Sequence, residues 1–158
     1  MRHTRAEVIK RCIREFRLLD RLVAGFKAAE WKKAVPRPET KDPWTVKDAL
    51  AHITYWKSGV TLSARGERRP PEERTLKLTD RNRLIYLRWR KRPAKEVLAW
   101  HRQVQVELLL ALRQAPDNWY SRPSREPNWP FDLDGHSSEH RLRDIERALA
   151  REKPRASQ

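Results

Sequence analysis

The chain has 158 residues and a net charge of +15, with 38% apolar and 36% charged residues. This length suits one domain with its own core, and we expect that domain to span residues 1–152, followed by a flexible basic tail over 153–158. No apolar run approaches the roughly 20 residues that cross a bilayer, and the first residues form no apolar signal core. These features exclude a membrane-spanning protein and predict a cytoplasmic one.

The positive charge raises the question of nucleic-acid binding, because Lys and Arg that neutralise phosphates release counterions. The basic residues are spread over separate stretches near residues 10–21, 88–92 and 141–155. This distribution favours a solvated cationic surface over a dedicated binding face. Nucleic acid is therefore an alternative partner that the sequence does not favour.

The first helix is predicted from about residue 5 to Trp31. Thr4 can cap its start together with Glu7, as in a capping box, and apolar residues then recur at helical spacing. Cys12, the only cysteine, falls on this apolar stripe, which predicts a buried structural thiol and excludes an intrachain disulfide. Prolines within residues 32–43 predict a loop after the helix.

The second helix has a clear start and end. Thr45 is a good N-cap, and Asp48 lies in the first turn, where an acid meets the positive end of the helix. Gly66 and the prolines after it end the pattern. The predicted buried face consists of Val46, Ala49, Leu50, Ile53 and Trp56.

Residues 65–78 are charged and contain prolines, and a connection of this length would let the third helix run parallel to the second. We expect the third helix to begin near Thr79, to kink or restart at Pro93 because proline lacks the N–H that the helix needs, and to end near Ala115. After an irregular crossing, a last helix begins near Gly135. The residues predicted to face inward on this helix are Leu142, Ile145 and Leu149.

Histidines are the clearest candidates for chemistry. His136 and His140 are four residues apart on the last helix, so both rings project from one face, and this spacing suits two ligands of one divalent ion. His52 lies in the middle of the second helix, and ligands on facing helices meet in the core of a bundle. Asp144 follows His140 by four residues, so His140 with Asp144 is a competing ligand pair. Since such pairs also arise by chance, a purely structural role stays open.

Other signatures of catalysis are missing from the sequence. There is no Gly-rich phosphate loop and no Gly-x-Ser-x-Gly elbow. The seven tryptophans are expected mainly in the core or at helix ends. Trp56, Trp89 and Trp129 are the candidates for lining a pocket that takes an apolar or aromatic small molecule.

Several segments resemble one superfamily, in order along the chain. Residues 44–53, Trp-Thr-Val-Lys-Asp-Ala-Leu-Ala-His-Ile, resemble the second-helix signature of the DinB-like superfamily, in which a tryptophan-containing cap precedes a helix with one inward histidine. Thr54-Tyr55-Trp56 and the stretch 80–98 are closer to the ClbS/DfsB-type four-helix bundle proteins. Residues 136–145 resemble the last helix of the superfamily, with its His-x-x-x-His pair.

The resemblance implies an all-α, DinB-like four-helix bundle with a long crossover between the second and third helices. It also implies a divalent metal, Zn, Ni or Fe, held by His52, His136 and His140. Some relatives place their histidine pair one turn later, so Asp144 is the alternative to His136. Known activities in the superfamily include metal-dependent thiol transfer and isomerisation, and the ClbS-type branch inactivates a reactive, DNA-damaging natural product by hydrolysis.

The leading hypothesis is an enzyme for a small-molecule ligand, a metal-dependent hydrolase or thiol transferase in detoxification or self-resistance. In this hypothesis Tyr55, Trp56 and Asn82 shape the substrate pocket. The alternative is a non-enzymatic protein that sequesters a genotoxin or shields DNA through its basic surface, and a third reading is a structural bundle with a vestigial site. A homodimer is compatible with each of these hypotheses.

Overall fold

The computed structural model describes residues 3–36, 38, 40–121 and 134–150. Within these residues the secondary structure is helical apart from one isolated bridge between Ala34 and Thr45. The elements are α1 (Arg5–Ala24), α2 (Ala28–Trp31), α3 (Val46–Ala64), α4 (Pro71–Arg74), α5 (Leu78–Trp89), α6 (Ala94–Gln114), α7 (Asp117–Tyr120), α8 (Gly135–His140), the π-helical turn η2 (Arg141–Glu146) and α9 (Arg147–Ala150).

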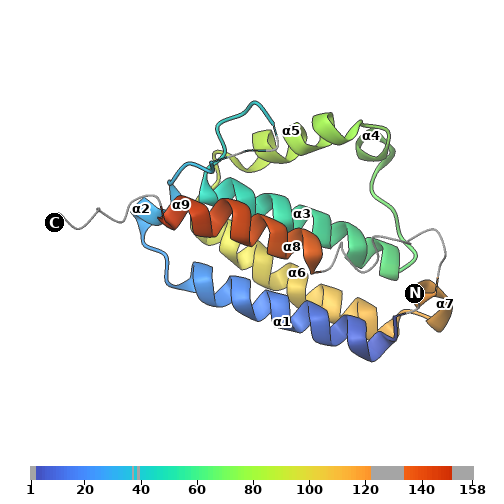
Figure 1. Cartoon of the computed structure of the whole chain (residues 1–158). Helices are drawn as coiled ribbons and strands as arrows, with labels where there is room; N and C mark the ends of the chain where they lie inside the picture. Colours follow the sequence, from blue (N-terminus) through green and yellow to red (C-terminus); the bar gives the residue numbers. More distant parts are fainter. Residues whose placement is uncertain (1–2, 37, 39, 122–133, 151–158) are drawn as a thin grey trace.

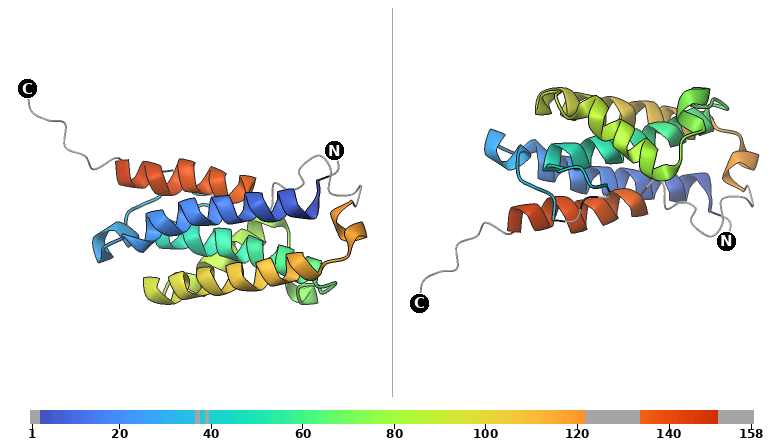
Figure 2. Two further views of the ribbon diagram at one scale, coloured as in Figure 1. Left: turned by 90° about the horizontal axis from the view of Figure 1, so that it is seen from below. Right: turned by 90° about the horizontal axis from the view of Figure 1, so that it is seen from above.

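Four long helical segments lie side by side as a bundle: α1, α3, α6 and the continuous segment formed by α8, η2 and α9 (Figures 1 and 2). The first and last segments run in one direction, whereas α3 and α6 both run in the other (Figure 1). Consecutive helices of a bundle that run parallel need a long connection between them. The predicted all-α, DinB-like bundle with a crossover after its second helix is confirmed.

The crossover between α3 and α6 contains α4 and α5. Residue Gly66 has a positive φ of 74°, a conformation that glycine adopts without strain, and it turns the chain out of α3. Helix α5 then runs back along α3 toward the end where α3 begins (Figure 1). There Lys47 Nζ donates to the carbonyl oxygens of Trp89, Arg90 and Arg92 at 2.6–3.2 Å, so a cation meets the negative end of α5. Pro93 restarts the chain as the N-cap of α6.

Three expectations about the helices were wrong. The third helix was expected to begin near Thr79 and to run parallel to the second, but α5 runs back along α3 as part of the crossover and only α6 is parallel to α3 (Figure 1). The first helix ends at Ala24 instead of Trp31, because Gly25 interrupts it and Ala28–Trp31 forms a separate turn. Leu142 was expected to face inward but is 47% exposed. The last helical segment buries a largely polar face, so its apolar residues do not mark the inward side. This buried face comprises Ser137, His140, Arg141, Asp144, Ile145 and Ala148.

The core consists of two apolar clusters, one around Leu50, Ile53 and Ile145 and the other around Leu108 and Leu112. Buried polar residues stand between the clusters on three helices, namely Glu15 on α1, Lys57 on α3, and His101 and Gln105 on α6. Cys12 is buried, as predicted, with its sulfur next to the Gln105 amide. No helix among the described residues is long and apolar enough to cross a membrane.

Candidate metal centre and adjoining pocket

The start of α3 fixes the position of His52. Thr45 and Asp48 form a capping box, in which the Asp48 carboxylate accepts hydrogen bonds from the Thr45 backbone N–H and hydroxyl at 2.8 Å. His52 follows one turn after Asp48, is 1% exposed, and packs its ring 4.8 Å from that of Trp44. The Trp44 ring, just before the N-cap, therefore packs against the imidazole and limits its orientation.

Three histidines meet between α3 and α8. The ring centroid of His140 lies 4.6 Å from that of His52 and 4.6 Å from that of His136. The Nε2 atoms of His52 and His136 are 3.2 Å apart. One nitrogen from each of the three rings lies within 4.8 Å of the others. The two helices thus bring together the three histidines that the sequence singled out.

Asp144 lies behind this cluster instead of within it. Its Oδ2 is 2.6 Å from Nδ1 of His140, and both side chains are almost fully buried. A carboxylate on one ring nitrogen fixes the tautomer and leaves the other nitrogen available as a ligand. Asp144 is thus engaged by His140, whereas the nitrogens that lie within 4.8 Å of one another come from His52, His136 and His140.

Burial keeps two of these imidazoles neutral. Desolvation, together with the neighbouring histidines, lowers the pKa of His52 from 6.5 to about 2. Desolvation and His140 lower the pKa of His136 from 6.5 to about 3. A neutral imidazole is the form that binds a metal ion, so neither ring has to lose a proton first at neutral pH.

The donor types of the three residues and the spacing of His52 and His136 fit a divalent ion. Two nitrogens bound at about 2.0–2.1 Å to a tetrahedral ion lie roughly 3.3 Å apart, close to the 3.2 Å between Nε2 of His52 and Nε2 of His136. Three imidazoles without cysteine are a donor set that suits Zn, Ni or Fe. Three protein ligands leave coordination positions open for water or substrate, as in catalytic zinc sites.

A pocket of about 460 Å³ opens beside the histidines. Its volume is within the range of sites that take small molecules. Trp56 and Asn82 line it, as expected, and Trp56 places its ring 6.3 Å from those of His52 and His136. The other lining residues are Gly59, Val60, Ser63, Arg69, Leu78 and Glu139.

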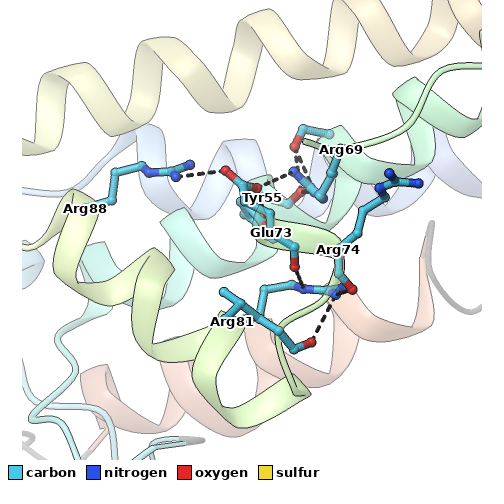
Figure 3. A network of polar contacts seen from close by, with 8 residues as sticks. Tyr55, Arg69, Glu73, Arg74, Arg81 and Arg88 are labelled. Carbon is cyan, nitrogen blue, oxygen red and sulfur yellow. Dashed lines mark hydrogen bonds and ion pairs between the residues drawn. The ribbon is translucent and has the colours of Figure 1, made fainter. Parts of the chain in front are cut away.

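Two of the expected pocket residues lie elsewhere. Tyr55 points toward α4, where its hydroxyl donates to Glu73 at 2.7 Å (Figure 3), because neighbouring residues of a helix project in different directions. Trp89 stacks on Trp100 with ring centroids 4.1 Å apart and does not line the pocket. Trp129, the third tryptophan candidate, lies outside the described residues.

A polar network ties the crossover to α3 on the side of Tyr55. Figure 3 shows Glu73 of α4 between Tyr55 and Arg88, and Arg88 donates to the Glu73 carboxylate at 2.8 Å. Arg81 of α5 donates to the carbonyl oxygens of Glu73, Arg74 and Leu76 at 2.9–3.3 Å. Burial and the bond to Glu73 raise the pKa of Tyr55 to about 12. These bonds hold α4 and α5 against the bundle and thereby form one wall of the pocket.

Sequence reasoning missed Arg69, Gly59 and Glu139 as pocket residues. Arg69 belongs to a charged, proline-containing stretch and carries no pattern that marks it as buried. Gly59 offered a signal, because a glycine inside a helix costs about 1 kcal/mol relative to alanine and calls for a reason. Glu139 precedes a histidine that the sequence did single out.

The family model described as mycothiol maleylpyruvate isomerase N-terminal domain matches residues 13–146. The matched region includes the three histidines, Asp144 and the residues of the pocket. The chain therefore belongs to this family, which is part of the DinB-like superfamily. No curated protein and no solved structure matches the chain.

Proposed function

Starting from this family membership, we propose that the protein binds one divalent metal ion through His52, His136 and His140 and acts on a small molecule in the adjoining pocket. One observation carries the proposal: nitrogens of three histidines from two helices lie within 4.8 Å of one another beside a pocket of about 460 Å³. Members of the superfamily often bind divalent metals. A fold alone does not give a function, so the proposal rests on this site.

The reaction we propose is hydrolysis or thiol transfer in detoxification or self-resistance. A bound divalent ion would supply a Lewis acid that polarises a substrate or lowers the pKa of a bound water or thiol. The chain itself contributes the remaining parts. Asp144 holds the His140 ring in place through Nδ1, and Trp56 supplies an aromatic wall. The activity implied by the resemblance to ClbS-type proteins, inactivation of a reactive natural product by hydrolysis, is one form of this proposal.

Elemental analysis tests the metal centre directly. The protein is purified without a histidine tag, equilibrated with Zn or Ni, freed of excess ion and measured. We expect about one ion per chain, and a large loss in His52→Ala and in His140→Ala. The matched control is His101→Leu, which removes a buried histidine outside the cluster and should leave the metal content unchanged.

Thermal melting gives an independent measure. A ligand that binds only the folded state stabilises it, by about 2.7 kcal/mol at a hundred times its Kd. Added Zn or Ni should raise the Tm of the wild type and of His101→Leu, but not that of His52→Ala. A wild-type metal content near zero that neither ion raises, with no change in Tm, would contradict the metal centre.

Sequestration of a small molecule without catalysis is the alternative function. One observation is compatible with it: at 3.2 Å, one of His52 and His136 can donate a hydrogen bond to the other, so the cluster also forms without an ion. A metal-free protein that still binds pocket ligands would favour this alternative. DNA shielding is separated by titrating labelled duplex at two salt concentrations, because affinity that disappears at moderate salt reflects only the surface charge.

A further inference from the structure

The wall of the pocket away from the histidines contains an arginine held against a glycine. Arg69 enters from the connection after α3 and places its guanidinium on the surface of that helix at Gly59. A Cβ atom added at Gly59 would lie only 2.7 Å from Nη2 of Arg69 and 3.3 Å from its Cζ. Gly59 therefore leaves the space that the guanidinium occupies.

Contacts on one edge fix the orientation of Arg69. Its Nη2 donates to the carbonyl oxygen of Tyr55 and, at 3.2 Å, to the hydroxyl of Ser58. Its guanidinium stacks 3.6 Å from the centroid of the Tyr55 ring, a favourable arrangement for arginine. The side chain is only 13% exposed, so this arginine is a built part of the wall.

The other edge of the guanidinium keeps donors for a ligand. Nη1 has only the Glu73 carboxylate nearby, at 3.9 Å, which is too long for a hydrogen bond. Nε makes no hydrogen bond to the described residues, and neither nitrogen is among the buried atoms without a partner. Both nitrogens therefore reach accessible space. The two fork edges of a guanidinium both include Nη2, which already donates to Tyr55 and Ser58, so Nη1 offers a carboxylate one charge-assisted hydrogen bond.

The charges around this wall leave Arg69 only partly compensated, by a long ion pair of 3.9 Å to Glu73. Glu73 is the nearest carboxylate, and it already accepts from Arg88 at 2.8 Å and from the Tyr55 hydroxyl at 2.7 Å. Glu139, the one acidic residue that lines the pocket, is paired with Arg143. An anion in the pocket would therefore meet Arg69 without displacing an existing strong ion pair.

Asn82 supplies a second, independent sign of a ligand. It projects from α5 into the same pocket and is only 3% exposed. Its Oδ1 is buried without a hydrogen-bond partner among the described residues. A buried acceptor without a partner is costly. A rotation of the Asn82 amide toward the pocket, which the side chain already lines, would let a ligand N–H or O–H satisfy it. Apolar surface between the polar groups comes from Trp56, Val60 and Leu78, of which Leu78 is 63% exposed.

We propose that Arg69 and Asn82 determine substrate specificity, and that the pocket takes a small apolar or aromatic molecule carrying a carboxylate and a nearby N–H, such as an N-acylamino acid. Arg69 binds the carboxylate, Asn82 accepts from the N–H, and the apolar part packs on Trp56. This inference rests on the proposed function as far as the reaction of the bound substrate is concerned. Binding at Arg69 and Asn82 needs no metal.

Three probes of similar size test the two contacts separately. N-acetylphenylalanine carries both groups, its C-terminal amide lacks the charge, and 2-benzyl-4-oxopentanoate has a CH2 group in place of the N–H. Binding is measured by calorimetry and tryptophan fluorescence on chelator-treated protein. We expect N-acetylphenylalanine to bind about tenfold more tightly than its amide, as one charge-assisted hydrogen bond predicts, and several-fold more tightly than 2-benzyl-4-oxopentanoate.

Substitutions assign these preferences to residues. Arg69→Gln should abolish the preference for the acid over the amide, and Asn82→Leu should abolish the preference for the probe with the N–H. The matched control is Arg68→Gln, which removes the same charge from the exposed neighbouring residue and should retain both preferences. Arg69→Lys keeps the charge but lacks the guanidinium that stacks on Tyr55, so it should give a weakened preference even if Arg69→Gln folds poorly. Circular dichroism reports whether each variant folds.

Several results would overturn the inference. Equal affinity for the acid and the amide would exclude the role of Arg69. An equal loss of the acid preference in Arg68→Gln and Arg69→Gln would also exclude it, because the preference would then come from the overall positive charge of the protein. An absence of binding by N-acetylphenylalanine at millimolar concentration also overturns it. Metal content is measured separately. A protein that takes up neither Zn nor Ni but keeps the acid preference would refute the metal centre and leave the roles of Arg69 and Asn82 in place.

Discussion

His101 is a buried histidine whose replacement should make the protein more resistant to acid. The residue is 2% exposed and stacks on Phe16 with ring centroids 4.8 Å apart. Neither ring nitrogen has a hydrogen-bond partner among the described residues, and the nearest acid, Asp20, lies 3.5 Å from Nε2. Burial, reinforced by the positive charge of Lys57, lowers the pKa of His101 from 6.5 to about 3.

The lowered pKa fixes the sign and the size of the effect. The folded protein leaves His101 neutral down to about pH 3, whereas the unfolded chain binds a proton near pH 6.5. Below pH 6.5 the unfolded state therefore holds one more proton, and stability falls by about 1.4 kcal/mol per pH unit. From pH 7 to pH 5 this residue alone should remove about 2 kcal/mol. His101→Leu removes that loss, together with a buried ring that lacks partners.

Urea unfolding at pH 7, 6 and 5, followed by tryptophan fluorescence with chelator present, measures this difference. The gap in unfolding free energy between His101→Leu and the wild type should widen by about 2 kcal/mol from pH 7 to pH 5. The matched control is Val104→Ala on the same helix, which lowers stability by an amount that does not depend on pH because no titrating group changes. A His101→Leu gap that stays constant over this range would refute the reasoning.

Three further predictions concern the pocket wall, the core and the metal centre. Gly59→Ala should not raise the free energy of unfolding by the roughly 1 kcal/mol that alanine contributes within a helix, because its Cβ would meet Arg69. The gain should return in an Arg69→Ala background, which a double-mutant cycle measured by urea unfolding tests. Lys57→Met should raise stability at pH 7 by about 1 kcal/mol or more, and the gain should shrink as pH approaches 10.5, because burial lowers the pKa of Lys57 in the folded state; a constant gain would contradict this. Asp144→Asn should weaken metal binding about 10- to 100-fold in a competition titration, through the lost support of His140, and an unchanged affinity would exclude that role.

The helices whose signals are local could be predicted well. The capping box of Thr45 and Asp48 joins residues three apart, and the break at Pro93 follows from one missing N–H. The shared face of His136 and His140 likewise follows from four-residue spacing. The fold class, the start of α3 and the identity of the three histidines were therefore within reach of the sequence, aided by the resemblance of residues 44–53 to a known superfamily.

The last helical segment shows where periodicity fails. Its buried face carries His140, Arg141 and Asp144, and Arg141 donates to the buried Glu15 carboxylate at 2.8 Å. A pattern read from apolar residues therefore selected Leu142, which is 47% exposed. Polar groups can face the core only where they find partners, and those partners come from helices that are distant in sequence.

The pocket depends even more on tertiary structure. Arg69 and Asn82 lie on the crossover, and their approach to the histidines depends on α5 running back along α3 (Figure 1). That His136 lies with His52, while Asp144 lies 2.6 Å from Nδ1 of His140, likewise depends on how the last helical segment packs against α3. The sequence by itself predicted most of the helices, their caps and the histidines proposed to bind a metal, because those properties depend on neighbours along the chain. Only the tertiary structure decided which of these residues share a site, because that depends on the packing of helices far apart in the chain.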